Sequence, residues 1–240
     1  MDGAYIVKTI NVYWSSMSPY MTQVEEPVPT KQIITGNQDS HESGWNICPA
    51  ITDYYKNMFT CKSPIDFRFK VNEDNQLFSD SFPYASEVKM PLTESDLSNK
   101  QYNLGFIPLF FADCESLPMQ QLHPVGCGGD FAEKTSVFQG EMDCAKYARL
   151  LDCQFKLHKD CNLVEINQGD ALFNLKFLTN SKIKFVRFFP NEEINQLLDV
   201  TTGQFLRKIN SKPKILQAHY DAFKRVKAHK RLLKLIKQSA

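Results

Sequence analysis

Four short apolar runs, all within residues 153–189, constrain the fold more than any other part of the sequence. The runs cover residues 153–158, 163–167, 171–178 and 182–189, and each is rich in Phe, Val, Ile or Leu. Polar residues that favour turns separate them. In the third run Phe173, Leu175 and Phe177 alternate with other residues, and a period of two is typical of strands with one buried face. The segment therefore predicts an antiparallel β-meander, with Gly169 in a tight hairpin turn.

The same patterns predict the remaining elements. Strands are expected at residues 4–14, 31–34, 65–71, 76–78, 102–112, 136–139 and 147–151. Loops are expected at 15–30, where Pro19, Pro27 and Pro29 oppose a central strand, at 113–130, and at 79–100 with one helical turn near residue 93. Helices are expected at 50–59, at 191–200 with Asn191 as its cap, and at 213–237.

Strands outnumber helices in this pattern, and turns are frequent. The sequence therefore predicts a mainly β (α+β) fold: an antiparallel β-sandwich, a jelly roll or a cupin-like barrel, with a helix at residues 50–59 and further helices near the C-terminus. We expect residues 1–204 to form this body. Residues 205–240 are expected to form a basic amphipathic helix that packs on the body or extends from it.

Composition indicates an ordinary globular chain of 240 residues, with 42% hydrophobic and 23% charged residues. The seven cysteines are odd in number and form no CxxC pair, which favours a reducing compartment and cysteines that act as small core residues. The N-terminal residues lack the pattern of a signal peptide, and no apolar run is long enough to span a membrane.

Charge is distributed unevenly, although the net charge is only +1. Residues 205–240 contain eleven Lys or Arg and one acid, whereas the other residues contain 17 Lys or Arg and 26 Asp or Glu. The candidate partner-binding residues are Lys224, Arg225, Lys227, Lys230, Arg231 and Lys234. Such a helix can present a solvated face, pair with the acidic body, lie on a membrane surface, or bind nucleic acid or an acidic protein.

The strongest motif for metal chemistry is His158-Lys159-Asp160. An HxD pair at a strand end, with a distant histidine, supplies the facial triad of non-haem Fe(II) oxygenases. His219 would be the third ligand and Arg187 would bind an oxoacid co-substrate, but His219 lies on the apolar stripe of the expected last helix. The alternative is a polar turn between strands with no cofactor.

A second motif is the glycine-rich stretch Gly126 to Asp130. Such loops bind phosphate when they join a strand to a helix, and neither element is expected here. His123 and Cys127 are close enough in sequence for a thiolate pair, and a surface loop with a free thiol is the alternative.

Several strings together resemble a group of uncharacterised proteins of tailed bacteriophages. They are Cys-Pro-Ala at 48–50, Asp-Tyr-Tyr-Lys-Asn at 53–57, Ser-Pro-Ile-Asp at 63–66 and Ile-Asn-Gln-Gly-Asp-Ala-Leu-Phe at 166–173. The lysine-rich C-terminus fits the same group. The resemblance implies a viral protein in the bacterial host cytoplasm or in the virion, and it assigns no catalytic residue.

No convergent set of catalytic residues accompanies these features. We therefore expect a non-enzymatic phage protein, a virion structural or assembly component that contacts other proteins or further copies of itself. The alternatives are a cupin-like Fe(II) oxygenase that uses His158 and Asp160, and a nucleic-acid-binding accessory protein that uses the C-terminal helix.

Overall fold

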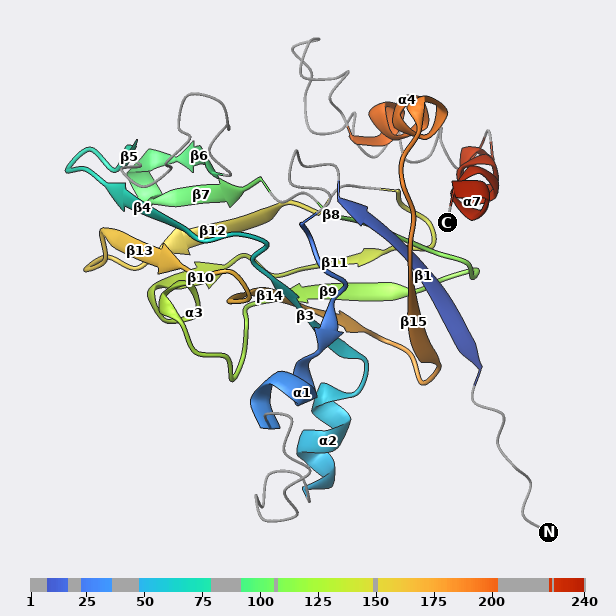
Figure 1. Cartoon of the computed structure of the whole chain (residues 1–240), viewed down its shortest axis with the longest axis horizontal. Coiled ribbons are helices and arrows are strands. Elements are labelled where there is room, and N and C mark those ends of the chain that lie inside the picture. The colour runs from blue at the N-terminus through green and yellow to red at the C-terminus, as the bar shows by residue number, and fades with distance from the viewer. Residues whose placement is uncertain are drawn as a thin grey trace.

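The computed structural model describes residues 8–16, 23–35, 48–78, 92–105, 108–148, 151–202, 225 and 227–239. Strands predominate in it, and they form four sheets in which one strand pair is parallel and the others are antiparallel (Figure 1). The predicted mainly β fold with a few added helices is confirmed. No helix within the described residues has the length and hydropathy needed to cross a membrane.

Two sheets form one half of the β body. The first has the order β15-β1-β8, from Lys182–Arg187, Thr9–Ser16 and Pro108–Ala112, and β1 runs parallel to β15. The second has the order β11-β9-β14-β3-β2. Its strands are Gly140–Asp143, Pro118–Leu122, Ala171–Phe177, Met58–Lys62 and Val28–Pro29.

Two further sheets complete the body. One has the order β10-β12-β7-β6, from Thr135–Val137, Cys153–Leu157, Gln101–Leu104 and Leu92–Asp96. The other has the order β13-β4-β5, from Leu163–Ile166, Phe67–Val71 and Leu77–Phe78.

The predicted β-meander is wrong in its pairing, although its four strands are correct. β12, β13, β14 and β15 belong to four different sheets, and none of them pairs with another. Gly169 does form a turn with a φ of 92°, but the strands on either side of it diverge. Alternation fixes which face of a strand is buried, whereas the choice of partner depends on contacts far along the chain.

Several other predicted elements are wrong. The helix α2 covers only Pro49–Tyr55, because Asn57 adopts a φ of 53° and the strand β3 follows at once. Residues 31–34, predicted as a strand, lie in the helix α1, Thr30–Thr35. The loop predicted at 113–130 contains β9, and the turn predicted near residue 93 is β6, followed by the short 3₁₀ helix η2 (Leu97–Asn99).

Two predictions near residues 102–151 are also wrong. The bent strand predicted at 102–112 is two strands, β7 and β8, in different sheets. Tyr147 and Ala148 are not in a strand, and β11 lies a few residues earlier.

The main core lies between the sheets and is rich in aromatic rings. Phe155 lies at its centre, with ring centroids of Phe131, Tyr102 and Phe69 at 5.0, 5.8 and 5.9 Å. All four side chains are fully buried. Each such ring pair adds roughly 0.5–1.5 kcal/mol beyond the area it buries.

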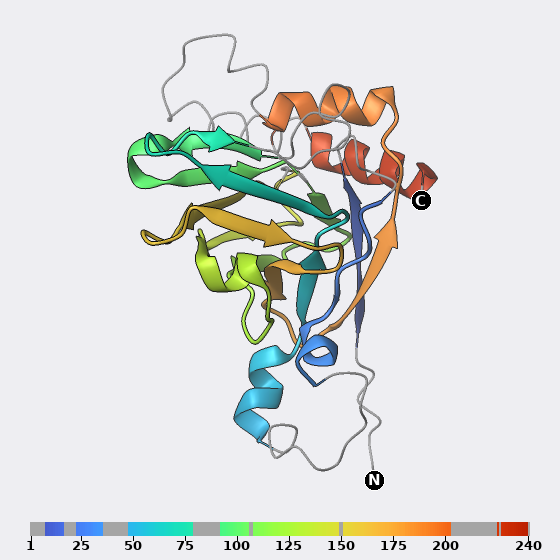
Figure 2. The same ribbon diagram turned by 60° about the vertical axis from the view of Figure 1, so that its left-hand side comes forward.

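A second core lies on the outer face of the β15-β1-β8 sheet. Here Tyr13, Phe111 and Phe188 point away from the main core and contact helices α4 (Glu192–Thr202) and α7 (Ala228–Ser239). Figures 1 and 2 show these two helices together at one end of the β body, with α1 and α2 at the other end.

The helix α4 follows its predicted pattern, whereas the helix predicted at 213–237 is interrupted at Lys227, which forms a turn with a φ of 57° just before α7. The Asn191 side chain accepts a hydrogen bond from Ile194 N–H at 2.9 Å, as predicted for the cap of α4. Only the second half of the helix predicted at 213–237 falls on described residues, as α7.

Candidate functional site

The basic helix α7 is held on the body by its apolar face. Leu232 and Ile236 are fully buried, and they pack in the second core with Leu109, Ile194 and Leu198. Burying a leucine or isoleucine side chain contributes roughly 1.5–3 kcal/mol. Anchored in this way, α7 presents its Lys and Arg residues outward in a fixed arrangement.

Five of the six predicted partner-binding residues are exposed on this helix or just before it. They are Arg225, Lys227, Lys230, Arg231 and Lys234, while Lys224 lies outside the described residues. Arg231 pairs with Glu193 of α4, and Lys237 Nζ pairs with Asp113 at 2.6 Å, which raises the pKa of Lys237. The remaining four of the five, Arg225, Lys227, Lys230 and Lys234, have no ion pair within the described part of the chain.

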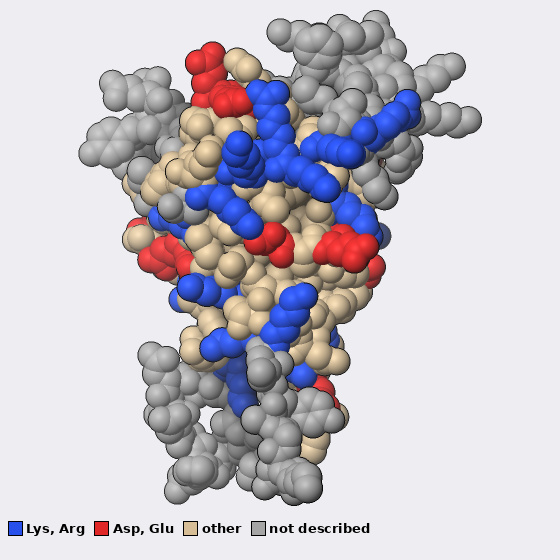
Figure 3. Space-filling model, turned by 90° about the vertical axis from the view of Figure 1, so that its right-hand side faces the viewer, with Lys and Arg blue, Asp and Glu red and all other residues tan. Residues whose placement is uncertain are grey.

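The strand β15 extends this basic surface down the outer face of its sheet. Lys182 and Lys184 are exposed, and they alternate with Ile183 and Phe185, which are buried in the main core. Figure 3 looks onto this side and shows Lys and Arg side chains spread across its upper half, with further ones below. We call Arg225, Lys227, Lys230, Lys234, Lys182 and Lys184 the basic face.

An exposed aromatic ring lies at the edge of the basic face. Phe189 is the second residue after β15 and is 54% exposed, the most exposed of the large hydrophobic side chains in the described residues. The Arg187 guanidinium lies 5.3 Å from its ring centroid and 5.0 Å from that of Trp14. The Phe189 N–H donates to the Ser239 carbonyl at 3.4 Å, which places the ring beside the end of α7.

Sequence reasoning assigned no binding role to Phe189, Lys182 or Lys184. The sequence does carry a signal for the two lysines, because residues 182–189 alternate and put Lys182 and Lys184 on the opposite face from Ile183 and Phe185. The same alternation would put Phe189 on the buried face with Phe185. It is exposed because the strand β15 ends at Arg187 and the chain then turns toward α4.

Of the three residues proposed for a metal site, the structure describes only His158 and Asp160. His158 and Asp160 are both exposed after β12, and His158 Nε2 lies 3.0 Å from the hydroxyl of Ser136. His219 lies outside the described residues. Within the described part, no three His, Cys, Asp or Glu side chains group closely enough to hold a metal ion. Binding of Fe(II) by these residues therefore remains a prediction.

The glycine-rich loop leads into the short helix α3, Asp130–Lys134, which the sequence did not predict. Asp130 occupies the start of this helix, and its pKa is lowered by the hydrogen bond from Lys134. A carboxylate at that position repels phosphate. Burial raises the pKa of Cys127, so its thiol is protonated at neutral pH and is a poor nucleophile.

His123 is held by the backbone and does not pair with Cys127. Its Nε2 lies 3.0 Å from the Ala132 carbonyl, and its Nδ1 accepts a hydrogen bond from Val137 N–H at 3.4 Å. Both ring nitrogens are therefore occupied, and the ring joins the loop to β10.

Comparison of the chain with protein-family models, with curated proteins and with solved structures finds no match.

Proposed function

We propose that this protein is a non-enzymatic bacteriophage protein that binds single-stranded nucleic acid through the basic face and Phe189. One observation carries the proposal: an anchored helix and a neighbouring strand present cations on one side of the molecule, next to an exposed aromatic ring. The phage context, in the host cytoplasm or the virion, rests on the sequence resemblance alone.

The arrangement of charge favours a polyanion. Lys230 and Lys234 are four residues apart, so they lie along one side of α7, and Lys227 is exposed in the turn just before the helix. Because these side chains have no acidic partner in the described structure, phosphates can neutralise them without breaking an ion pair. Release of the counterions condensed on a nucleic acid then drives binding.

The exposed ring favours a single strand over a duplex. Proteins that bind single strands combine a basic track for the backbone with aromatic rings on which bases stack. Stacking on such a ring contributes roughly 1–3 kcal/mol per base, and a base in a duplex is already stacked. Phe189, which Arg187 contacts, supplies such a ring beside the C-terminal end of α7.

A virion structural or assembly component that works through protein contacts is the alternative. Interfaces of that kind have a core of clustered apolar side chains. In the described residues the exposed large hydrophobic side chains are on different elements: Tyr54, Val125, Phe138, Leu178 and Phe189. Mass spectrometry of purified virions tests the alternative, because a virion component must be found in the particles.

Binding to a fluorescent oligothymidylate at low salt, followed by anisotropy, tests the proposal. Replacement of Lys227, Lys230 and Lys234 by Gln should weaken binding roughly tenfold or more. The matched control replaces three exposed lysines of other strands and turns, Lys70, Lys156 and Lys159, by Gln. It removes the same charge and should leave the affinity unchanged. Absent binding, or equal losses in both variants, would contradict the proposal.

A further inference from the structure

A second exposed aromatic ring lies near the other end of β15 from Phe189. Tyr54, in α2, is 43% exposed. Figure 2 shows β15 running from the end of the β body that carries α2 to the end that carries α4 and α7. The strand therefore begins near α2 and Tyr54, and it ends two residues before Phe189.

Hydrogen bonds hold the end of α2 against the turn that leads into β15. The Asn57 side chain donates through Nδ2 to the carbonyls of Thr179 and Ser181, at 2.7 and 2.9 Å. Lys56 Nζ donates to Asn180 Oδ1 at 3.2 Å. These contacts fix the position of α2 relative to the start of β15, where the lysine row of that strand begins.

A cation supports the Tyr54 ring, as Arg187 supports the ring of Phe189. Lys176 Nζ lies 4.4 Å from the Tyr54 ring centroid and donates to the Tyr54 carbonyl at 2.9 Å. The exposed Lys56 follows two residues later, and its printed partner is a neutral amide. Within the described residues neither Lys56 nor Lys176 forms an ion pair, so both charges remain available to phosphates.

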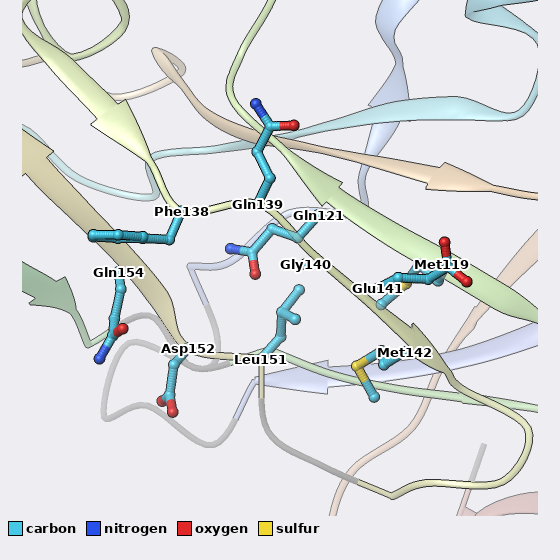
Figure 4. A pocket seen from close by; sticks show the side chains of 10 residues that line it. All are labelled: Met119, Gln121, Phe138, Gln139, Gly140, Glu141, Met142, Leu151, Asp152 and Gln154. Carbon is cyan, nitrogen blue, oxygen red and sulfur yellow. The ribbon is translucent and has the colours of Figure 1, made fainter.

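The exposed ring of Phe138 has the opposite surroundings. Phe138 is also 43% exposed, between β10 and β11. It lines a hollow whose charged residues are Glu141 and Asp152, and no Lys or Arg is among the described residues of that lining (Figure 4). Carboxylates repel a phosphate backbone. Stacking of a nucleic-acid base is therefore favoured at Tyr54 and opposed at Phe138.

The length of β15 separates Tyr54 from Phe189. Residues 181–189 can extend over roughly 26 Å at about 3.3 Å per residue, and Lys182 and Lys184 lie exposed along this segment. At the duplex spacing of about 3.4 Å per nucleotide, a strand of about 4 nucleotides spans about 10 Å and one of about 16 spans about 50 Å. Only the longer strand can reach both rings.

We propose that Tyr54 is a second base-stacking site for the same single-stranded nucleic acid, and this inference rests on the proposed function. One strand runs along β15 from Phe189, past Lys184 and Lys182, to Tyr54. A base stacks on the part of the Tyr54 ring that is open to solvent, and Lys56 neutralises a phosphate beside it.

Anisotropy with oligothymidylates of about 4 and about 16 nucleotides tests this second site. With the long strand, Tyr54→Ala should raise the Kd roughly 5–150-fold, because one base loses its stacking surface. With the short strand, which the basic face and Phe189 hold, Tyr54→Ala should leave the Kd unchanged. Phe189→Ala should raise the Kd for both lengths. Tyr54→Phe keeps the ring and should bind both strands like the unaltered chain.

Phe138→Ala is the matched control, because it removes an equally exposed ring and should leave both Kd values unchanged. If Phe189→Ala weakens binding of the long strand and Tyr54→Ala binds it as well as Phe138→Ala does, the second site is overturned and the proposed function stands. An equal rise in Kd for both lengths in Tyr54→Ala would also overturn the second site. Absent binding of either strand to the unaltered chain would overturn the proposed function and the second site together.

Discussion

The Arg187 guanidinium lies 5.3 Å from the ring centroid of Phe189, so a cation supports an aromatic ring that is open to solvent. The Phe189 N–H also donates to the Ser239 carbonyl, which joins this segment to the end of the basic helix α7. It provides the two kinds of group that a nucleotide needs, a charge for the phosphate and a flat surface for the base.

Removal of the Phe189 ring should weaken binding to single strands. The expected loss for Phe189→Ala is roughly 1–3 kcal/mol, or about 5–150-fold in Kd, because one base loses its stacking surface. Anisotropy with oligothymidylate measures it. Leu178→Ala is the control, since Leu178 is also an exposed apolar side chain but lies outside the basic face. Equal Kd values for Phe189→Ala and the unaltered chain would refute the role of the ring.

Truncation of Leu232 should loosen α7 from the body. Leu232 is fully buried in the second core, and Leu→Ala at such positions costs roughly 2–5 kcal/mol. The free energy of unfolding in urea measures the loss. Leu235→Ala, at a partly buried position of the same helix, should cost less. A Leu232→Ala cost equal to that of Leu235→Ala would mean that α7 is not anchored through Leu232.

The neutral form of His123 should make stability depend on pH. Burial lowers the pKa of His123; the nearby His158 also lowers it, and the hydrogen bond to Ala132 partly opposes the shift. The unfolded chain, with a histidine pKa of about 6.5, therefore binds more protons than the folded chain at acidic pH. This contribution to stability is complete above about pH 6.5 and is lost as the pH falls below it.

Urea unfolding at about pH 7.5 and about pH 5.5 measures this effect. His123→Gln cannot take up the proton, so its free energy of unfolding should fall less between the two conditions. The same fall in both proteins would assign the pH dependence to other groups.

Buried hydrogen bonds between side chains connect β3 with α1 and β14. Thr60 Oγ1 donates to Asn174 Oδ1 at 2.8 Å and lies 3.0 Å from Thr30 Oγ1. Thr60→Val keeps the shape but leaves both partners buried without Thr60, at a cost of roughly 1–3 kcal/mol. Thermal unfolding measures it, with the exposed Thr93→Val as control. A loss no larger than that of the control would mean that water replaces the lost partner.

Local pattern predicted much of the fold and little of its assembly. Alternation located the strand β14 through Phe173, Leu175 and Phe177, and the cap at Asn191 located the start of α4. Pairing was not predictable, because the contact of β15 with β1 joins Ile10 to Ile183 across most of the chain. The strand β9 was missed because its buried face contains a glutamine, Gln121, which weakens the apolar alternation.

The candidate site was predictable in part for the same reason. The cations of α7 are a local feature of composition and were identified from the sequence. Phe189 depends on the end of one strand lying next to the end of a distant helix, as its hydrogen bond to Ser239 shows.

The salt dependence of oligothymidylate binding tests the central claim most directly. Each phosphate neutralised on a single strand contributes about 0.7 to the slope of log Kd against log salt. The variant with Gln at Lys227, Lys230 and Lys234 should therefore show a slope lower by about 2 than the unaltered chain, whereas the control with Gln at Lys70, Lys156 and Lys159 should keep the full slope. A slope that is the same in all three proteins, or binding that does not respond to salt, would contradict the assignment of the basic face as a nucleic-acid interface.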